Sequence, residues 1–239
     1  MDHLPEPDRT QVLRDAPSVV VAPRQRALYP RWILANAAGE LLGLGATFAS
    51  IAAIMPSIEG SRGPSGLLVG FAVLVLTGVL EATVVALLQH RAMRPWLPRL
   101  SVGTWWRATL IGALIAYALG YLPSTLMDAA GGASGGASSE PPVWIVLPLA
   151  AILGAVAGAI LSLFQALALR RHVPHAGAWI PANMIAWAIG MPIIFFAIDR
   201  ALVLSASWQT VSVLGAGLLV SGATVGTVHG RTLVRLLRA

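Results

Sequence analysis

Two glutamates, Glu40 and Glu81, are the residues of this 239-residue sequence best suited to chemistry. Each lies inside a long apolar stretch, Glu40 eight residues after Trp32 and Glu81 eight residues before Gln89. An ionisable side chain in such a stretch is costly to bury and is therefore a candidate functional group. Two neighbouring carboxylates cannot both stay ionised, so a Glu40–Glu81 pair would hold a proton or share a cation.

Three amide side chains extend this candidate substrate- or ion-binding site, namely Asn36, Gln165 and Asn183. Asn36 and Asn183 occupy matching positions near the starts of two apolar stretches, and Gln165 lies five residues before Arg170. Amides inside a membrane commonly hydrogen-bond to a neighbouring helix, each for about 0.6 kcal/mol. Helix packing is therefore the alternative role for all three, and separate polar neighbours are the alternative for the glutamates.

Other familiar chemistry is not indicated by the sequence. There is no cysteine, and the Walker A, H-E-x-x-H and dinucleotide-binding patterns are absent from the sequence. His172 and His175 lack the acidic companions of a metal site, and His229, near Arg231, is interpreted as a solvated histidine at a helix end. We expect no enzymatic activity, no catalytic residue and no metal site, and the sequence leaves open which cofactor, if any, is bound.

The elements that must position these residues are six long apolar stretches. Hydrophobic residues make up 56% of the chain and charged residues only 11%, against about 25% in soluble domains. A membrane-spanning helix needs roughly 20 apolar residues. We therefore predict an all-α membrane protein with six transmembrane helices, at Trp32–Met55, Gly66–Gln89, Thr104–Leu126, Trp144–Leu169, Trp179–Leu202 and Trp208–His229.

All sixteen basic residues are arginines, and most lie in segments at alternate ends of these stretches. Such asymmetry follows the positive-inside rule and argues against nucleic-acid binding. It predicts a bacterial cytoplasmic (inner) membrane protein with both termini in the cytoplasm. Several of these arginines should contact anionic lipid headgroups, each contributing about 1 kcal/mol, or a partner protein. They are Arg91, Arg94, Arg99, Arg170 and Arg171.

An internal repeat runs through the chain. The pattern W-x-x-A-[N/T]-x-x-[G/A] begins at Trp32, Trp105 and Trp179, at intervals of 73 and 74 residues. Two helices per unit keep every copy in the same orientation, so the pattern predicts three repeated two-helix hairpins with pseudo-threefold symmetry. Each of these tryptophans is expected at the membrane interface, where indole is enriched.

Part of the chain resembles a group of known sequences. G-x-x-x-G, Gln and L-R-R followed by W-x-x-A-N is similar to uncharacterised multipass bacterial membrane proteins. This resemblance implies a fold of repeated helical hairpins and no particular activity. The matching residues are Gly154, Gly158, Gln165, Leu169, Arg170, Arg171, Trp179, Ala182 and Asn183.

These observations divide the chain into a cytoplasmic tail at 1–30, a six-helix domain at 31–230 and a basic cytoplasmic end at 231–239. The three repeats would cover about 31–100, 101–175 and 176–235. Small-residue packing and the lack of a reactive site favour a membrane subunit or scaffold of a larger complex, with protein partners in the membrane. The alternative is a small-solute transporter, or its substrate-binding membrane component, with a Glu40/Glu81 site. A scaffold should lack a central cavity, and a transporter should have one.

Overall fold

The computed structural model describes residues 27–59, 64–129 and 141–238, and every regular element in these ranges is a helix. The first span consists of α2 (Leu28–Gly39), the π-helical segment η2 (Glu40–Leu44) and α3 (Gly45–Glu59). The remaining elements are α4 (Pro64–Met93), α5 (Val102–Ala129), α6 (Val143–Leu169), the short 3-10 helix η3 (Ala176–Ala178), α7 (Trp179–Leu202) and α8 (Ser207–Leu236).

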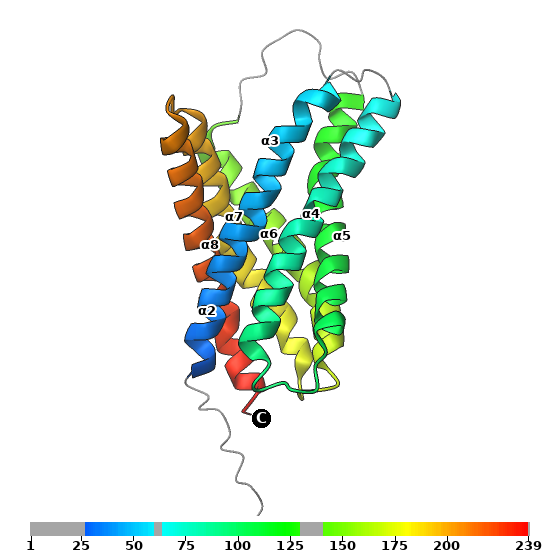
Figure 1. The fold of residues 1–239 in the computed structure, drawn as a ribbon, viewed down its shortest axis with the longest axis vertical. Helices are drawn as coiled ribbons and strands as arrows, with labels where there is room; N and C mark the ends of the chain where they lie inside the picture. The colour runs from blue at the N-terminus through cyan, green and yellow to red at the C-terminus, as the bar shows by residue number, and fades with distance from the viewer. Residues whose placement is uncertain (1–26, 60–63, 130–140, 239) are drawn as a thin grey trace, which may run out of the picture.

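These helices form six spans that are long and apolar enough to cross a membrane, which confirms the predicted all-α membrane fold. Successive spans run in opposite directions, so the start of α2 and the end of α8 lie at the same end of the bundle (Figure 1). We call this the terminal end and the opposite one the far end. Each span packs against the next along the chain, and α8 packs against α2, so the six helices form a closed ring.

Several helices are longer than hydropathy alone predicts. α4 continues to Met93 and α8 continues to Leu236, four and seven residues past the predicted ends. Hydropathy detects only the apolar part of a helix, whereas backbone hydrogen bonds continue wherever the chain remains helical. The predicted tail at 1–30 lies mostly outside the described residues, and α2 already begins at Leu28.

Glycines allow the helix backbones to approach closely. A Cβ built on Gly158 of α6 would lie 2.6 Å from the carbonyl oxygen of Asn183 in α7. A Cβ on Gly222 of α8 would lie 2.5 Å from the carbonyl oxygen of Asn36 in α2. Small residues of this kind are typical of helix interfaces in membranes, where close packing replaces the hydrophobic effect.

Large apolar side chains cover the outer surface instead. Leu34, Ile152 and Val211 are each more than 60% exposed, on three different spans. A water-soluble protein would bury such residues, whereas lipid tails solvate them as well as a protein core does. The outward-facing side chains thus agree with a protein embedded in a bilayer.

Candidate functional site

Three buried tryptophan indoles hold the spans together at one level near the terminal end. Nε1 of Trp32 donates to Nδ1 of His229 at 2.9 Å, and Nε1 of Trp105 donates to Oε1 of Gln89 at 3.2 Å. Nε1 of Trp179 donates to Oε1 of Gln165 at 2.9 Å. In each case the tryptophan begins one span and its acceptor lies near the end of the span that packs beside it. We call these six side chains the tryptophan layer.

The amides of this layer also hydrogen-bond across a second helix contact. Nε2 of Gln89 donates to Oδ1 of Asn36 at 2.8 Å, and Nε2 of Gln165 donates to Oγ1 of Thr109 at 3.0 Å. Asn183 donates to the carbonyl oxygen of Trp179 in its own helix, at 2.9 Å. Asn36 and Gln165 therefore take part in hydrogen bonds between helices, which is the alternative role that the sequence predicted for them.

Two sequence interpretations are wrong at this layer. Trp32, Trp105 and Trp179 are each 0% exposed, so their indoles are covered by other helices and do not face lipid headgroups or water. An indole can leave the interface because a buried acceptor satisfies its N–H group. His229 is 1% exposed and lies within α8, so it is not a solvated histidine at a helix end.

Glu40 lies eight residues past Trp32 and so about 12 Å further from the terminal end, at the start of the π-helical segment of the first span. Such segments insert one extra residue into a helical turn and occur often at functional sites. Glu40 is 1% exposed, and its Oε2 atom has no hydrogen-bond partner among the described residues. A buried polar atom without a partner typically costs about 1–3 kcal/mol, so this carboxyl group is not explained by packing alone.

Glu81 lies on α4, eight residues from Gln89 and so about 12 Å further from the terminal end. Oε2 of Glu81 accepts a hydrogen bond from the hydroxyl group of Tyr117 on α5. The backbone of Glu81 packs against Gly43 in the π-helical segment, where an added Cβ would lie 2.9 Å from the Glu81 Cα. Glu81 is half-buried, because part of its side chain faces a cavity.

The two glutamates share a small polar cavity of about 20 Å³, which is room for about one water molecule. Both carboxyl-bearing side chains lie in the wall of this one cavity. All five residues of the predicted site line this cavity, although they come from the first span, α4, α6 and α7. The polar lining consists of Asn36, Glu40, Glu81, Gln89, Thr109, Gln165, Asn183 and His229.

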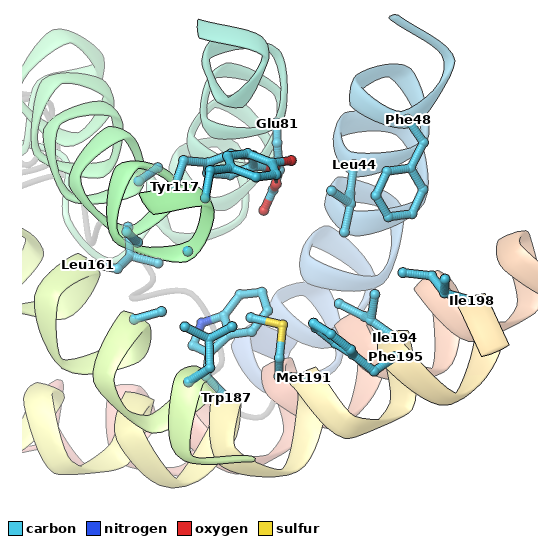
Figure 2. A pocket seen from close by; sticks show the side chains of 16 residues that line it. Leu44, Phe48, Glu81, Tyr117, Leu161, Trp187, Met191, Ile194, Phe195 and Ile198 are labelled. Carbon is cyan, nitrogen blue, oxygen red and sulfur yellow. Dashed lines mark hydrogen bonds between the residues drawn. The ribbon is translucent and has the colours of Figure 1, made fainter. Parts of the chain in front are cut away.

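A larger cavity of about 310 Å³ adjoins the small one on the side away from the tryptophan layer. Glu81, Ala113, Leu161 and Trp187 line both cavities, and Figure 2 shows Glu81 and Tyr117 across from Trp187 and Met191. Aliphatic and aromatic side chains of the first span, α5, α6 and α7 form the rest of its wall. Gly120 lines the cavity and is exposed, so the cavity reaches the protein surface beside α5.

The arginines singled out from the sequence lie apart from both cavities. Arg91, Arg94, Arg99, Arg170 and Arg171 are all exposed at the terminal end, where Arg91 lies in the last turn of α4 and the others lie just after α4 or α6. Within the described ranges, no group of three or more His, Cys, Asp or Glu side chains gathers that could hold a metal ion. What the arrangement offers chemically is a carboxyl-bearing cavity that could bind a small molecule or a cation.

Sequence reasoning missed Gln89, Tyr117 and Trp187 as members of this region. Gln89 gave a usable signal, because it ends its apolar stretch as Gln165 nearly does in the next hairpin. Tyr117 gave none, since a tyrosine in an apolar helix is usually packing material. Its role appears only when α5 brings its hydroxyl group to Glu81.

The tryptophan layer makes a testable contribution to stability. Gln165→Met keeps the length of the side chain and removes the partners of Trp179 and Thr109. We expect the free energy of unfolding to fall by about 1 kcal/mol, the sum of two interhelical hydrogen bonds in a membrane protein. Titration with sodium dodecyl sulfate in mixed micelles measures this loss. Gln209→Met, near the start of α8 and outside the layer, is the control, and equal stability of both variants would contradict the prediction.

No protein-family model, no curated protein and no solved structure matches this chain, so its function must be inferred from the geometry of these two cavities and the tryptophan layer.

Proposed function

We propose that this protein binds a small organic solute and moves it across the membrane, as a transporter or as the substrate-binding membrane component of one. The observation that carries this proposal is the cavity of about 310 Å³ inside the bundle, with Glu81 in its wall. Protein interiors are close-packed, and helix bundles place ligand sites between their helices. Ligand pockets have volumes of about 300–1,000 Å³, so this one suits a small molecule.

The lining of the cavity also supports a binding role. Apolar and aromatic side chains dominate its wall, and the few polar groups are Glu81, Tyr117, Tyr121 and the indole of Trp187. This balance is typical of small-molecule sites, where apolar contacts give affinity and a few polar groups fix the orientation of the ligand. The tryptophan layer links the spans on the terminal side, and none of its six side chains lines the larger cavity.

A threefold repeat of hairpins is part of the proposal. The three indole-to-amide or indole-to-imidazole hydrogen bonds support it, because each links the start of one hairpin to the end of another and they close a ring. Asn36 and Asn183 both donate to the carbonyl oxygen of the tryptophan four residues earlier, which also supports equivalent hairpins. Parallel repeats with a site at their interface are a common plan among transporters.

The proposal also includes the orientation of the protein in the membrane, which is inferred from the arginines. Exposed Arg91, Arg94, Arg99, Arg170 and Arg171 at the terminal end favour a cytoplasmic location for that end, in a bacterial inner membrane. They would also contact anionic headgroups there. The larger cavity then lies in the outer half of the bilayer, which suits capture of a solute from outside the cell.

The role of subunit or scaffold predicted a bundle without a central cavity, so the cavity of about 310 Å³ weighs against it as the sole role. Protein partners remain part of the proposal in another form. A substrate-binding membrane component of this size would need a partner ATPase to drive transport.

A search for a ligand of the larger cavity tests the proposed function. The protein, purified from its native host in mild detergent, is analysed by native mass spectrometry for a co-purifying molecule and screened by thermal shift against small organic solutes. A ligand at 100 times its dissociation constant should stabilise the protein by about 2.7 kcal/mol. Ala157→Phe, in the cavity wall, should abolish that stabilisation, and Ala72→Phe, exposed on α4, should leave it unchanged.

The opposite outcomes are equally clear. A protein that carries no molecule and is stabilised by none of the solutes would contradict the proposal. So would a ligand whose effect survives Ala157→Phe in a variant that still folds. Stoichiometric co-purification of other polypeptides without a small molecule would favour the subunit role.

A further inference from the structure

We propose that the larger cavity takes a small organic cation with an apolar body, and that Glu81 is its counter-ion. This inference rests on the proposed function and names the class of solute. Sixteen residues line the cavity, and Glu81 is the one among them with a formal charge. A cavity with a single acid and no base selects against anions, because an anion would face the carboxylate with no compensating cation.

Among the residues that the structure describes, no lysine or arginine lines either cavity to neutralise this region. The chain has no lysine, and the arginines of the described helices lie outside both cavities. His229 is the one basic side chain that lines the small cavity, and its Nδ1 atom already accepts the indole hydrogen bond of Trp32. Within the described part of the chain, the region therefore contains two carboxyl groups, Glu40 and Glu81, and no positively charged partner.

An unsatisfied oxygen atom points independently to a missing partner. Oε2 of Glu40 is buried in the small cavity wall without a hydrogen-bond donor, among the residues that the structure describes. The small cavity adjoins the larger one through Glu81, so a cation bound beside Glu81 would also lower the electrostatic cost of the Glu40 carboxyl group. No hydrogen bond from the described residues provides this compensation at Oε2 of Glu40.

The aromatic wall fits an organic cation better than a bare metal ion. Tyr117, Tyr121, Trp187, Phe48 and Phe195 all line the larger cavity, and the rings of Tyr117 and Tyr121 lie 5.8 Å apart. The faces of aromatic rings attract cations, and clusters of rings recognise quaternary ammonium groups. A metal ion would instead require several oxygen ligands, and this wall offers few.

Hydrogen bonding by Tyr117 orients the proposed counter-ion. Its hydroxyl group donates to Oε2 of Glu81, which holds the carboxyl group against α5 and beside the cavity. Tyr117 is thus a positioning residue, and Glu81 contacts the ligand. Replacing Glu81 with glutamine keeps an acceptor for Tyr117 and removes the charge, so Glu81→Gln isolates the electrostatic contribution.

A pair of probes with the same shape tests the inference. Benzyltrimethylammonium carries a positive charge, and neopentylbenzene is its neutral isostere. Binding of both to the full chain in detergent is measured by calorimetry and thermal shift. We expect the cation to bind at least about tenfold more tightly than the isostere, which corresponds to about 1.4 kcal/mol. Glu81→Gln should remove this preference, and Asp199→Asn, an exposed acid at the far end of α7, should retain it.

A second variant pair guards against misfolding of Glu81→Gln. Tyr121→Phe keeps the aromatic face, whereas Tyr121→Leu removes it, so only the leucine variant should weaken binding of the cation, by about threefold. If the parent protein binds both probes equally and Ala157→Phe abolishes this binding, the cation inference is overturned and the proposed function remains intact. Binding of neither probe would also overturn it, and the wider solute screen would then decide the proposed function by itself.

Discussion

Gly154→Ala is expected to lower the free energy of unfolding by about 1–3 kcal/mol, the typical cost of overpacking a well-packed contact. The added methyl group would overlap the carbonyl oxygen of Trp187 and lie 2.8 Å from Cβ of Met191. A backbone carbonyl cannot rotate away as a side chain can, so α6 and α7 must separate. Trp187 and Met191 both line the larger cavity, and ligand binding should weaken together with stability.

Gly120→Ala is the matched control for this prediction. Gly120 lies within α5, and a Cβ built there meets no atom within 4 Å. Alanine favours a helix over glycine by about 1 kcal/mol, so the control should be as stable as the parent protein or slightly more stable. Unfolding of both variants by sodium dodecyl sulfate gives the comparison. Equal behaviour of Gly154→Ala and Gly120→Ala would show that the close contact between α6 and α7 is not needed.

The six spans were predictable because the bilayer imposes a single strong rule. A chain in lipid must satisfy its backbone hydrogen bonds internally, and a run of about 20 apolar residues therefore becomes a helix. That rule concerns the solvent and applies to each span separately. It gives the number of helices and their approximate positions, and it does not determine how the helices pack.

The tryptophans illustrate what a single-span rule cannot provide. Statistics place indole at the interface because its N–H group needs a polar partner. Gln89, Gln165 and His229 supply that partner inside the protein, but each lies far along the chain or on a different helix. The preference reverses once helix packing brings donor and acceptor together, and no local pattern around Trp32 or Trp179 encodes this outcome.

Membership of the candidate site was partly predictable for a related reason. Glu40 and Glu81 stood out because a charged residue in an apolar stretch is rare, and equal depth on adjacent antiparallel helices suggested that they could meet. The structure places both in the wall of one small cavity. The larger cavity was not predictable, because its wall consists of ordinary apolar and aromatic residues whose spacing along each helix resembles that of any packed face.

Glu40→Met is expected to raise the free energy of unfolding by about 1–3 kcal/mol, the opposite sign to most substitutions of a buried residue. Methionine has a similar length and removes a carboxyl group whose Oε2 atom has no partner among the described residues. Its flexible side chain can fill the space against Gly222 that the Glu40 side chain now occupies. Unfolding in mixed micelles at neutral pH measures the change.

Gln89→Met provides the matched contrast to this variant. Gln89 is also buried and polar, but it donates to Asn36 and accepts from Trp105. Its removal should lower stability by about 1 kcal/mol, since two interhelical hydrogen bonds are lost. A fall in stability for Glu40→Met as well would contradict the prediction and show that the Glu40 carboxyl group stabilises the fold.

A gain in stability would have a further consequence for function. Proteins retain a residue that opposes folding where activity requires it, so sites that lower stability mark functional positions. The stabilised Glu40→Met protein should then bind benzyltrimethylammonium more weakly than the parent, because one of the two carboxyl groups that attract the cation is lost. Unchanged binding would show that Glu81 alone attracts the cation. Greater stability combined with weaker binding would identify Glu40 as part of the same electrostatic site.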